Sequence, residues 1–390
     1  MLSEKIINLV RDALNLSGDP ASHRVVVAMS GGVDSSVAAG LVKMAGFETI
    51  GITLQLYDHG EAISKKGACC AGQDIHDARR VCDKLGIAHY VLDYESKFRE
   101  AVIDEFVDSY MAGETPIPCV TCNQTVKFAD LLAQSKDLGA DCLVTGHYVE
   151  SRLRAKSNHH YDMLTPVDMA RDQSYFLFAT TQDQLDFLRF PLARLSKEET
   201  REIADTLGLD IAQKPDSQDI CFVPEGNYAD LIKKMRPDAE QAGEIVHVDG
   251  RELGEHDGIV NFTIGQRRGL GVSDNAPLYV TKLDPASATV YVGPREALKR
   301  DTIVLKGLNW ISDVQLDGFD SKRLIYVKLR STRPARPGRL IQHDGEIVVK
   351  LEEADYGISA GQACVIYEQQ GIGAKVMGGG FIARTSILDD

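Results

Sequence analysis

Apolar and polar positions follow two regular patterns between Arg24 and Tyr148. Short, continuous apolar runs rich in β-branched residues predict buried parallel strands, and longer stretches with apolar residues three and four positions apart predict helices between them. The expected strands are Arg24–Met29, Thr49–Leu56, His89–Asp93 and Cys142–Thr145, and the expected helices are Ser35–Ala45, Ile75–Leu85, Phe98–Met111 and Val126–Leu138. Because strands and helices alternate, we expect a doubly wound parallel α/β sheet whose ligands bind at the carboxyl ends of the strands.

The hydrophobic pattern changes after residue 211. Gly, Asp and Pro become frequent, and the pattern predicts one short helix, Tyr228–Met235, followed by short strands and turns. From residue 293 onward, alternating runs separated by Asp-Gly and Pro-Gly turns are typical of a small β-barrel. We therefore expect three domains: an α/β domain over 1–211, a small central α+β domain over 212–292, and a C-terminal β-barrel domain over 293–390.

Composition and length are those of an ordinary multidomain globular protein. The chain has 390 residues, of which 44% are hydrophobic and 26% are charged. Its net charge of −14 excludes a protein that is basic overall, although a local basic patch could still bind nucleic acid. Charged residues interrupt the beginning of the chain, and no apolar run approaches the ~20 residues of a membrane span. We expect a cytoplasmic enzyme.

One segment of the expected barrel is strongly basic. Between Lys322 and Arg339 the sequence KRLIYVKLRSTRPARPGR contains seven Lys and Arg residues and no acidic residue. In an acidic protein such a cluster is a candidate surface for a phosphate backbone. The alternative is an edge strand that its charges protect from aggregation.

A phosphate-binding loop is predicted between the first strand and the first helix, where the sequence reads Ser30-Gly-Gly-Val-Asp-Ser-Ser36. Glycines allow close backbone approach, and the helix N-terminus offers N–H groups and the positive end of a dipole. A Walker loop would carry a lysine after its glycines, and this loop has none. The SGGxDS pattern resembles the pyrophosphate-binding loop of the N-type ATP pyrophosphatases, which adenylate a carbonyl or carboxylate. That resemblance implies a pyrophosphate cradle of Ser30, Gly31, Gly32, Ser35 and Ser36, with Asp34 helping to hold Mg²⁺.

The eight cysteines are too sparse for a secreted disulfide scaffold. Cys119 and Cys122 form a CxxC directly before the helix expected from Val126. Because a helix N-terminus lowers the pKa of a thiol, we expect a reactive cysteine here, helped by the charge of Lys127. Apolar surroundings predict buried core thiols at Cys82, Cys142 and Cys364.

A CxxC pair has three possible meanings: a redox dithiol, half of a metal site, or one nucleophile with a neighbour. No second CxxC exists, so a structural zinc site would lack ligands. Cys221 lies farther along, in the polar stretch QKPDSQDICFV. Together with Cys122 it could carry a persulfide to an activated carbon and release the sulfur through a disulfide.

Seven motifs together carry a resemblance to one family. They are SGGVDSS, the PxPCxxCN-x3-KF segment, TGHY, RDQSYFL, KPDSQDICF, NFTIGQRRGLG and GQACVIY. Between Arg24 and Arg384 the chain resembles the bacterial tRNA-specific 2-thiouridylases, members of the N-type ATP pyrophosphatase superfamily. The resemblance implies an adenine nucleotide alpha hydrolase-like fold. It also implies ATP-dependent 2-thiolation of the wobble uridine of tRNA, by adenylation of the uridine 2-oxygen and sulfur transfer from a cysteine persulfide, with release of AMP and pyrophosphate.

The resemblance also implies roles for particular residues. Cys122 takes the nucleophile position and Cys221 the persulfide position, and the two end each reaction as a disulfide. The implied ATP contacts are Ala28, Met29, Ser30, Gly31, Gly32, Val33, Asp34, Ser35, Leu54 and Gly146. The implied tRNA contacts are Ile117, Pro118, Cys119, His147, Arg171, Asp172, Gln173, Arg330, Ser331 and Gln362. The implied partners are tRNA and a persulfide donor, either a cysteine desulfurase or a sulfur-relay protein, and we expect a monomer that uses ATP with Mg²⁺.

The sequence departs from the common family pattern at two places. Ile117-Pro118-Cys119 stands where many members have Asn-Pro-Asp, which removes an acid/base candidate near the uridine. Cys119 either replaces that function or is merely tolerated. Leu54 stands where methionine is usual, an apolar exchange that should preserve an adenine contact.

Three alternatives remain open. Cys119, Cys122 and Cys221 could ligate an iron–sulfur cluster that delivers sulfide. The SGGVDSS loop could belong to an amide ligase, but Cys122, Cys221 and the basic segment of the barrel would then have no role. A protein that only binds tRNA would leave the loop unexplained.

Overall fold

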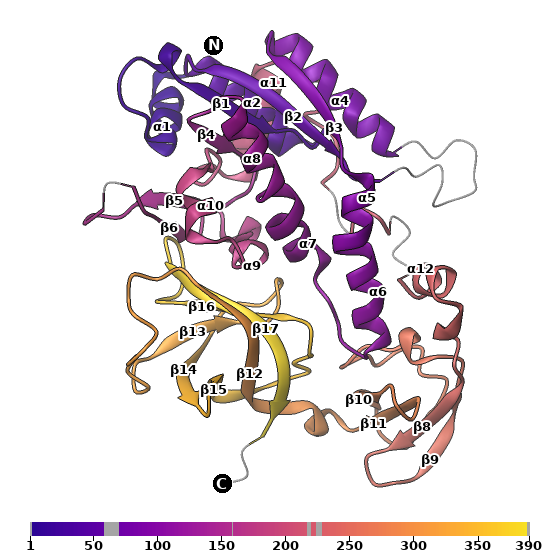
Figure 1. Ribbon diagram of the computed structural model, residues 1–390. Helices are drawn as coiled ribbons and strands as arrows, with labels where there is room; N and C mark the ends of the chain where they lie inside the picture. The colour runs from indigo at the N-terminus through magenta and orange to yellow at the C-terminus, as the bar shows by residue number, and fades with distance from the viewer. Residues whose placement is uncertain (1, 58–69, 158, 217–219, 224–227, 388–390) are drawn as a thin grey trace. The chain divides into compact units, whose positions relative to one another are not determined.

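The computed structural model describes residues 2–57, 70–157, 159–216, 220–223 and 228–387 (Figure 1). The chain forms two compact units. The first comprises Met1–Ala101, Cys119–Gln218 and Gln369–Val376, and the second comprises Val102–Pro118, Asp219–Glu368 and Met377–Asp390. No helix in the described residues is long and apolar enough to cross a membrane.

A five-stranded parallel sheet organises the first unit. Its strands are β1 (Arg24–Ala28), β2 (Glu48–Gln55), β3 (Ala88–Asp93), β4 (Cys142–Val144) and β7 (Leu188–Arg189). The strand order is β3-β2-β1-β4-β7 and all neighbours are parallel, so the direction of winding reverses at β1. This confirms the expected doubly wound sheet, and each of the four predicted strands is confirmed to within one residue at either end.

The helix α2 (Val33–Met44) is the centre of the first unit's core. Nearly all of its residues are buried, from Val33 to Val42, and it packs against β1, β2, α4 (Cys70–Leu85) and α11 (Lys197–Thr206). A helix that is apolar all round needs such complete burial. The phosphate loop is therefore anchored at the start of the most deeply buried helix of this unit.

The predicted helices Ser35–Ala45 and Ile75–Leu85 are present as α2 and α4, which begin two and five residues earlier, and the other two predicted helices are interrupted. The helix expected over Phe98–Met111 is divided into α5 (Glu95–Phe98), the π-helical turn η2 (Arg99–Ile103) and α6 (Asp104–Met111). The helix expected over Val126–Leu138 begins earlier, as α7 (Pro118–Thr121), and continues through the π-helical turn η3 (Cys122–Lys127) before α8 (Asp130–Asp137). Proline is favoured in the first turn of a helix, where its missing N–H is not needed, so Pro118 is a suitable first residue for α7.

The first unit also contains several shorter helices, 3-10 turns and a β-hairpin. They are α1 (Glu4–Leu14), η1 (Pro20–Ser22), the hairpin β5 (Glu150–Leu153) and β6 (Tyr161–Leu164), η4 (Met169–Arg171), α9 (Ser174–Leu177) and α10 (Gln182–Phe187). Serine and glutamate form a capping box at the start of α11, as in the sequence Ser196-Lys-Glu-Glu199.

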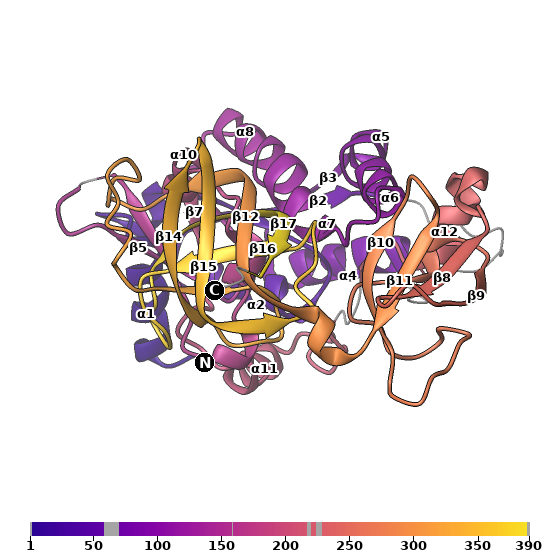
Figure 2. The ribbon, with the colours of Figure 1, turned by 90° about the horizontal axis from the view of Figure 1, so that it is seen from below.

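The second unit contains a four-stranded sheet and a closed barrel. The sheet has the order β10-β11-β8-β9, and the barrel has the order β12-β15-β14-β13-β16-β17. Figure 2 shows the sheet and most of the barrel strands from below. Each has its own apolar core. The elements are α12 (Tyr228–Met235), η5 (Pro237–Ala239), β8 (Gly243–His247), β9 (Glu252–His256), η6 (Ile259–Asn261), β10 (Tyr279–Asp284), β11 (Thr289–Gly293), η7 (Arg295–Leu298), β12 (Lys299–Trp310), β13 (Ile325–Lys328), β14 (Arg336–His343), β15 (Glu346–Tyr356), β16 (Ala363–Tyr367) and β17 (Val376–Ser386).

This architecture confirms the predicted fold class, an α/β parallel sheet with a small central domain and a C-terminal barrel. The short helix over Tyr228–Met235 is also confirmed. The domain limits at residues 211 and 292 stay a prediction.

Candidate active site

The SGGVDSS sequence forms a tight loop between β1 and α2. Gly31 has a φ of 72°, and a Cβ atom there would collide with the backbone carbonyl of Asp74, so only glycine fits. The Ser35 hydroxyl accepts a hydrogen bond from the Ser30 N–H at 3.1 Å, and the Ser36 hydroxyl donates to the Gly32 carbonyl at 2.7 Å. The loop is thus held in shape by its own side chains, at a helix N-terminus suited to an anion.

The end of β4 comes close to this loop. Gly146 follows that strand, and a Cβ atom on it would lie 2.6 Å from the Ser35 nitrogen. Because real Cβ atoms essentially never come so near, glycine is required for β4 to approach the loop.

A pocket of about 230 Å³ opens at the carboxyl ends of β1, β2 and β4, beside the reversal point of the sheet. One part of its wall is apolar, with Ile52, Leu54, Leu56, Phe128 and Leu131. The remaining lining residues are Ala28, Met29, Ser30, Asp34, Ser35, Lys127, Thr145, Gly146, His147 and Gln173. The structure therefore brings together seven of the ten residues expected to contact ATP, while Gly31, Gly32 and Val33 belong to the loop but do not line the pocket.

His147 lies in this pocket as a neutral imidazole. Burial, together with the charge of Lys127, lowers its pKa to about 3, and its Nδ1 is 2.8 Å from the Thr145 hydroxyl. A neutral ring can accept or donate a hydrogen bond but provides no charge for a phosphate. The expected contact of His147 with tRNA stays a prediction, as does that of Gln173.

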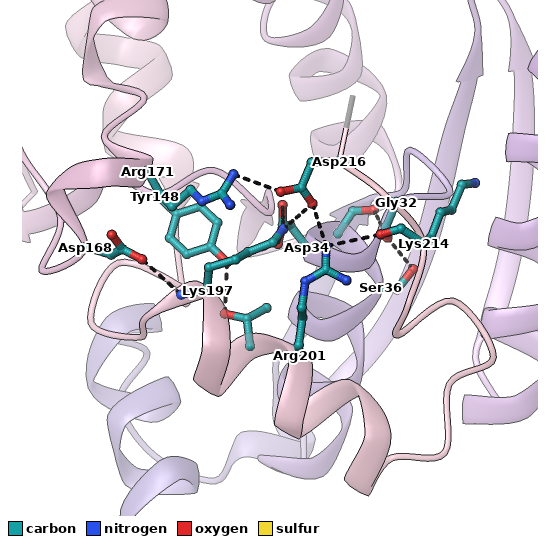
Figure 3. Close-up of polar contacts among 12 residues, drawn as sticks. Gly32, Asp34, Ser36, Tyr148, Asp168, Arg171, Lys197, Arg201, Lys214 and Asp216 are labelled. Carbon is teal, nitrogen blue, oxygen red and sulfur yellow. Dashed lines mark hydrogen bonds and ion pairs between the residues drawn. The ribbon is translucent and has the colours of Figure 1, made fainter. Parts of the chain in front are cut away.

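Asp34 of the loop is held by a buried lysine (Figure 3). The Lys197 ammonium lies 2.7 and 2.9 Å from the two Asp34 carboxylate oxygens, and the Tyr148 hydroxyl donates to Asp34 at 3.0 Å. With both oxygens engaged by a cation, this carboxylate is a poor ligand for Mg²⁺ in this arrangement. The predicted magnesium role of Asp34 is not favoured by these contacts.

The same lysine reaches the segment that leads towards Cys221. Lys197 lies 2.7 Å from Asp216, which also pairs with Arg171 at 2.8 Å and Arg201 at 3.1 Å. Burial raises the pKa of Asp216, but the hydrogen bond and charge of Lys197 and the two arginines outweigh burial and leave the pKa below its usual value. Arg171, expected at tRNA, therefore already has an acidic partner.

A second lysine makes a parallel connection. The Lys214 ammonium donates to the Gly31 carbonyl at 3.0 Å and pairs with Asp74 at 2.7 Å and Asp77 at 2.6 Å. The phosphate loop is thus tied to residues 214–216 by two separate ion-pair groups. The sequence predicted none of these connections, because the partners lie about 140 to 180 positions apart and no local pattern relates them.

The CxxC pair spans two consecutive helical turns. Cys119 is exposed in α7, whereas Cys122, the first residue of η3, is only 5% exposed. Burial raises the pKa of Cys122, and Lys127 opposes this only in part. The expected lowered pKa is therefore wrong for Cys122, because the helix begins four residues earlier and the thiol is buried instead of standing at the helix N-terminus.

The other thiols divide into core and exposed groups. Cys82, Cys142 and Cys364 are buried, which confirms their prediction as core residues, and burial raises the pKa of Cys82 and of Cys142 to about 12. Cys221 is exposed and lies in the second unit. Among the described cysteines no disulfide is formed, so the expected Cys122–Cys221 disulfide is not present in this state.

Several residues expected at tRNA have hydrogen-bond partners within the protein. The Gln362 amide donates to the Thr115 carbonyl at 2.9 Å, and the Thr115 hydroxyl lies 2.9 Å from that of Ser359. The Arg330 guanidinium donates to the Gly357 carbonyl. Ile117 is buried, and Pro118 begins α7. Asp172 accepts hydrogen bonds from the backbone N–H and the hydroxyl of Ser174. Ser331 is partly exposed. Gln362 therefore anchors the stretch that precedes the CxxC pair.

The basic segment of the barrel is largely neutralised. Acidic residues elsewhere in the barrel pair with four of its arginines: Arg323 with Glu368, Arg333 and Arg336 with Asp355, and Arg339 with Glu352. Lys328 is buried. These pairs do not favour an open phosphate-binding surface. The alternative of an edge strand is wrong, because β13 and β14 each pair with a strand on both sides in the closed barrel.

No group of three or more His, Cys, Asp or Glu side chains in the described residues could hold a metal ion. Cys119 and Cys122 supply two neighbouring thiols, whereas Cys221 belongs to the other compact unit. The iron–sulfur alternative receives no support from the described residues and stays a prediction.

Three family models match the chain in succession. The model described as the tRNA methyl transferase HUP domain matches residues 23–225, that of the tRNA methyl transferase PRC-barrel domain matches 229–294, and that of the aminomethyltransferase beta-barrel domain matches 300–382. A tRNA-specific 2-thiouridylase MnmA from Brucella ovis is 57% identical over 375 residues, which are 96% of this chain and 94% of the relative. The same figures hold for the protein of that name from Brucella abortus strain S19.

Solved structures are much more distant. The U34-tRNA thiolase NcsA from Methanococcus maripaludis with its [4Fe-4S] cluster is 18% identical, with a TM-score of 0.38, over 60% of this chain and 73% of that one. A 4-thiouridine synthetase–RNA complex with bound ATP is 16% identical, with a TM-score of 0.34, over 56% and 51%.

The fold and the loop define a doubly wound α/β protein with a phosphate loop at the reversal point of its sheet, joined to a C-terminal barrel. The family models and the identity over nearly the full length of both chains are more specific. The chain belongs to the tRNA-specific 2-thiouridylase family.

Proposed function

We propose that this protein replaces the 2-oxygen of the wobble uridine of tRNA by sulfur, using ATP. One observation carries the proposal: Lys127, which lines the pocket beside the SGGVDSS loop, ends the π-helical turn that Cys122 begins. A nucleotide-binding loop and a cysteine nucleophile on neighbouring elements of one unit suit activation of a substrate followed by attack on it.

In the first step the pocket binds ATP, with its apolar wall towards the adenine and the loop N–H groups and Ser30 and Ser35 towards the phosphates. The flipped-out uridine presents its 2-oxygen to the α-phosphate. An O–P bond forms to the uridine, the α–β bond breaks, and pyrophosphate leaves. Lys127 is the cation of the pocket lining best placed to balance the developing charge.

In the second step the sulfur arrives as a persulfide on Cys221, loaded by a partner that supplies sulfur at the persulfide level. Either the terminal sulfur attacks C2 of the uridine while Cys122 attacks the inner sulfur, or Cys122 first releases hydrosulfide, which then attacks C2. In both routes AMP leaves, the persulfide S–S bond breaks, and a Cys122–Cys221 disulfide forms. Two thiols from a reductant must then restore the enzyme. We propose a monomer that acts with Mg²⁺ bound to ATP.

The test is transfer of sulfur-35 from a persulfide-loaded donor to unmodified tRNA in a single turnover, with and without ATP. We expect transfer that requires ATP, Cys122 and Cys221, in protein purified anaerobically and free of iron. Full transfer by the Cys221→Ser variant would overturn the persulfide role. Activity that tracks bound iron would support the iron–sulfur alternative, and pyrophosphate release with a small acid but not with tRNA would support an amide ligase.

A further inference from the structure

The CxxC pair has an uneven exposure that the proposed reaction leaves unexplained. Cys119 is exposed and Cys122 is 5% exposed, although they are separated by only two residues of continuous helical chain. Residues three apart on a helix face the same side, with Cβ atoms about 5–6 Å apart. The charge of Cys119 also affects the pKa of Cys122, as expected of neighbours. The Cα atoms of residues three apart on a helix are about 5 Å apart, which a disulfide can bridge once the Cβ atoms move to about 4 Å from each other.

The proposed reaction ends with a disulfide whose two sulfur atoms differ in exposure. Each turnover leaves Cys122 in a disulfide, which must be reduced before the next one. A reductant protein must bring a thiolate into contact with one of the two sulfur atoms. The Cys122 sulfur is buried, so direct attack is open only at the exposed Cys221. The exposed Cys119 thiol, one helical turn away in the same chain, can attack the Cys122 sulfur in an intramolecular reaction.

We propose that Cys119 is the resolving thiol of this enzyme. This inference rests on the proposed function and adds the route by which the enzyme is reset. The Cys119 thiolate attacks the Cys122 sulfur, a Cys119–Cys122 bond forms, and the Cys122–Cys221 bond breaks. Cys221 leaves as a thiolate and takes up the proton that Cys119 lost. An external protein dithiol then attacks the exposed Cys119 sulfur, is itself oxidised to a disulfide, and leaves both Cys119 and Cys122 as thiols.

This role would also account for a thiol at position 119, where many members of the family have aspartate. An aspartate cannot take part in thiol–disulfide exchange. Serine at the same position keeps a polar group of similar size and removes only this chemistry, so Cys119→Ser is the informative change.

The first experiment compares two reductants within each enzyme, so that any effect of the substitution on tRNA binding cancels. Multiple-turnover thiolation is measured with a thioredoxin-type protein dithiol and with dithiothreitol, each relative to the first turnover. We expect wild type and the neighbouring control Thr121→Ser to cycle with both reductants. We expect Cys119→Ser to cycle with dithiothreitol but to be at least tenfold slower with the protein dithiol. Equal cycling with both reductants would overturn the proposal and indicate direct reduction at Cys221.

The second experiment needs neither ATP nor tRNA and so remains informative if the proposed function fails. Wild type is titrated with a mild disulfide oxidant, and the products are mapped by mass spectrometry. We expect an intramolecular Cys119–Cys122 disulfide that a protein dithiol opens. Oxidation that yields only adducts on Cys119, with Cys122 remaining a thiol, would refute the resolving role. Failure of the proposed function would show instead as no sulfur transfer in the first turnover of wild type.

Discussion

Replacing Lys197 by methionine removes the charge that joins the phosphate loop to residue 216 while keeping a side chain of similar length. Among its contacts with described residues, Asp34 would keep the hydroxyl of Tyr148, whereas Asp216 would keep Arg171 and Arg201. The damage should therefore concentrate on Asp34, whose carboxylate would become an uncompensated negative charge beside the pocket.

The expected loss of stability follows from burial. Removing one partner of a fully buried ion pair costs about 3–5 kcal/mol. The Lys197 side chain is 9% exposed but that of Asp34 is 30% exposed, so water relieves part of the penalty. We expect a loss of about 2–3 kcal/mol in the free energy of unfolding of the first unit. The same negative charge should raise the KM for ATP.

The assay must report on the first unit. The single tryptophan, Trp310, lies in the barrel strand β12, so its fluorescence follows the second unit and serves as an internal reference. Hydrogen exchange of the α2 and α11 amides in urea measures the first unit. Exposed Lys5→Met is the control, for which we expect a change below about 0.5 kcal/mol.

A second substitution tests the cause. Asp34→Asn in the Lys197→Met background removes the uncompensated charge and should recover about half of the lost stability, a coupling that a double-mutant cycle measures. The reasoning is refuted if Lys197→Met is no more destabilising than the control, or if the second substitution recovers nothing.

Three further predictions follow from individual contacts. Gly146→Ala should raise the KM for ATP at least tenfold, because the new methyl group would lie 2.6 Å from the Ser35 nitrogen. Unchanged nucleotide binding in a calorimetric titration would contradict this prediction. Burial raises the pKa of Cys122, so the rate of its alkylation by iodoacetamide should be low at pH 7 and should increase steeply only at strongly alkaline pH. Peptide mapping measures this rate, and rapid alkylation at pH 7 would contradict the burial of the thiol. Burial raises the pKa of the Asp77 carboxyl, but its hydrogen bonds to Lys214 and Gln73 outweigh burial and leave the pKa below its usual value. The stability that the ionised Asp77 contributes is therefore present above about pH 4 and is lost as the pH falls through the lowered pKa of the folded state. Lys214→Met should destabilise the protein at pH 6 and progressively less towards pH 2, as urea titrations would show.

The sequence predicted the parallel sheet well because buried parallel strands are short, continuous apolar runs. It missed β7, which has only two residues and is defined by pairing with β4, not by a pattern of its own. It also missed the π-helical turns, which insert one extra residue per turn without a residue type that marks them.

The candidate site was predictable only where its residues are consecutive. The loop and its glycines follow from one short motif, and Gly146 follows from the end of a strand. Lys197, Lys214 and Asp216 meet the loop through folding alone, so no spacing in the sequence could relate them. The prediction of a lowered pKa for Cys122 was wrong for a related reason. Burial depends on tertiary packing, and its effect on the pKa is larger than the effect expected from a helix terminus.

The central claim is that the pocket activates the 2-oxygen of the tRNA uridine by adenylation. The most direct test uses tRNA labelled with oxygen-18 at the uridine 2-oxygen, in a single turnover with persulfide-loaded enzyme, followed by mass spectrometry of the AMP released. The account predicts one labelled oxygen in AMP for each 2-thiouridine formed. Thiolated tRNA accompanied by unlabelled AMP would contradict it.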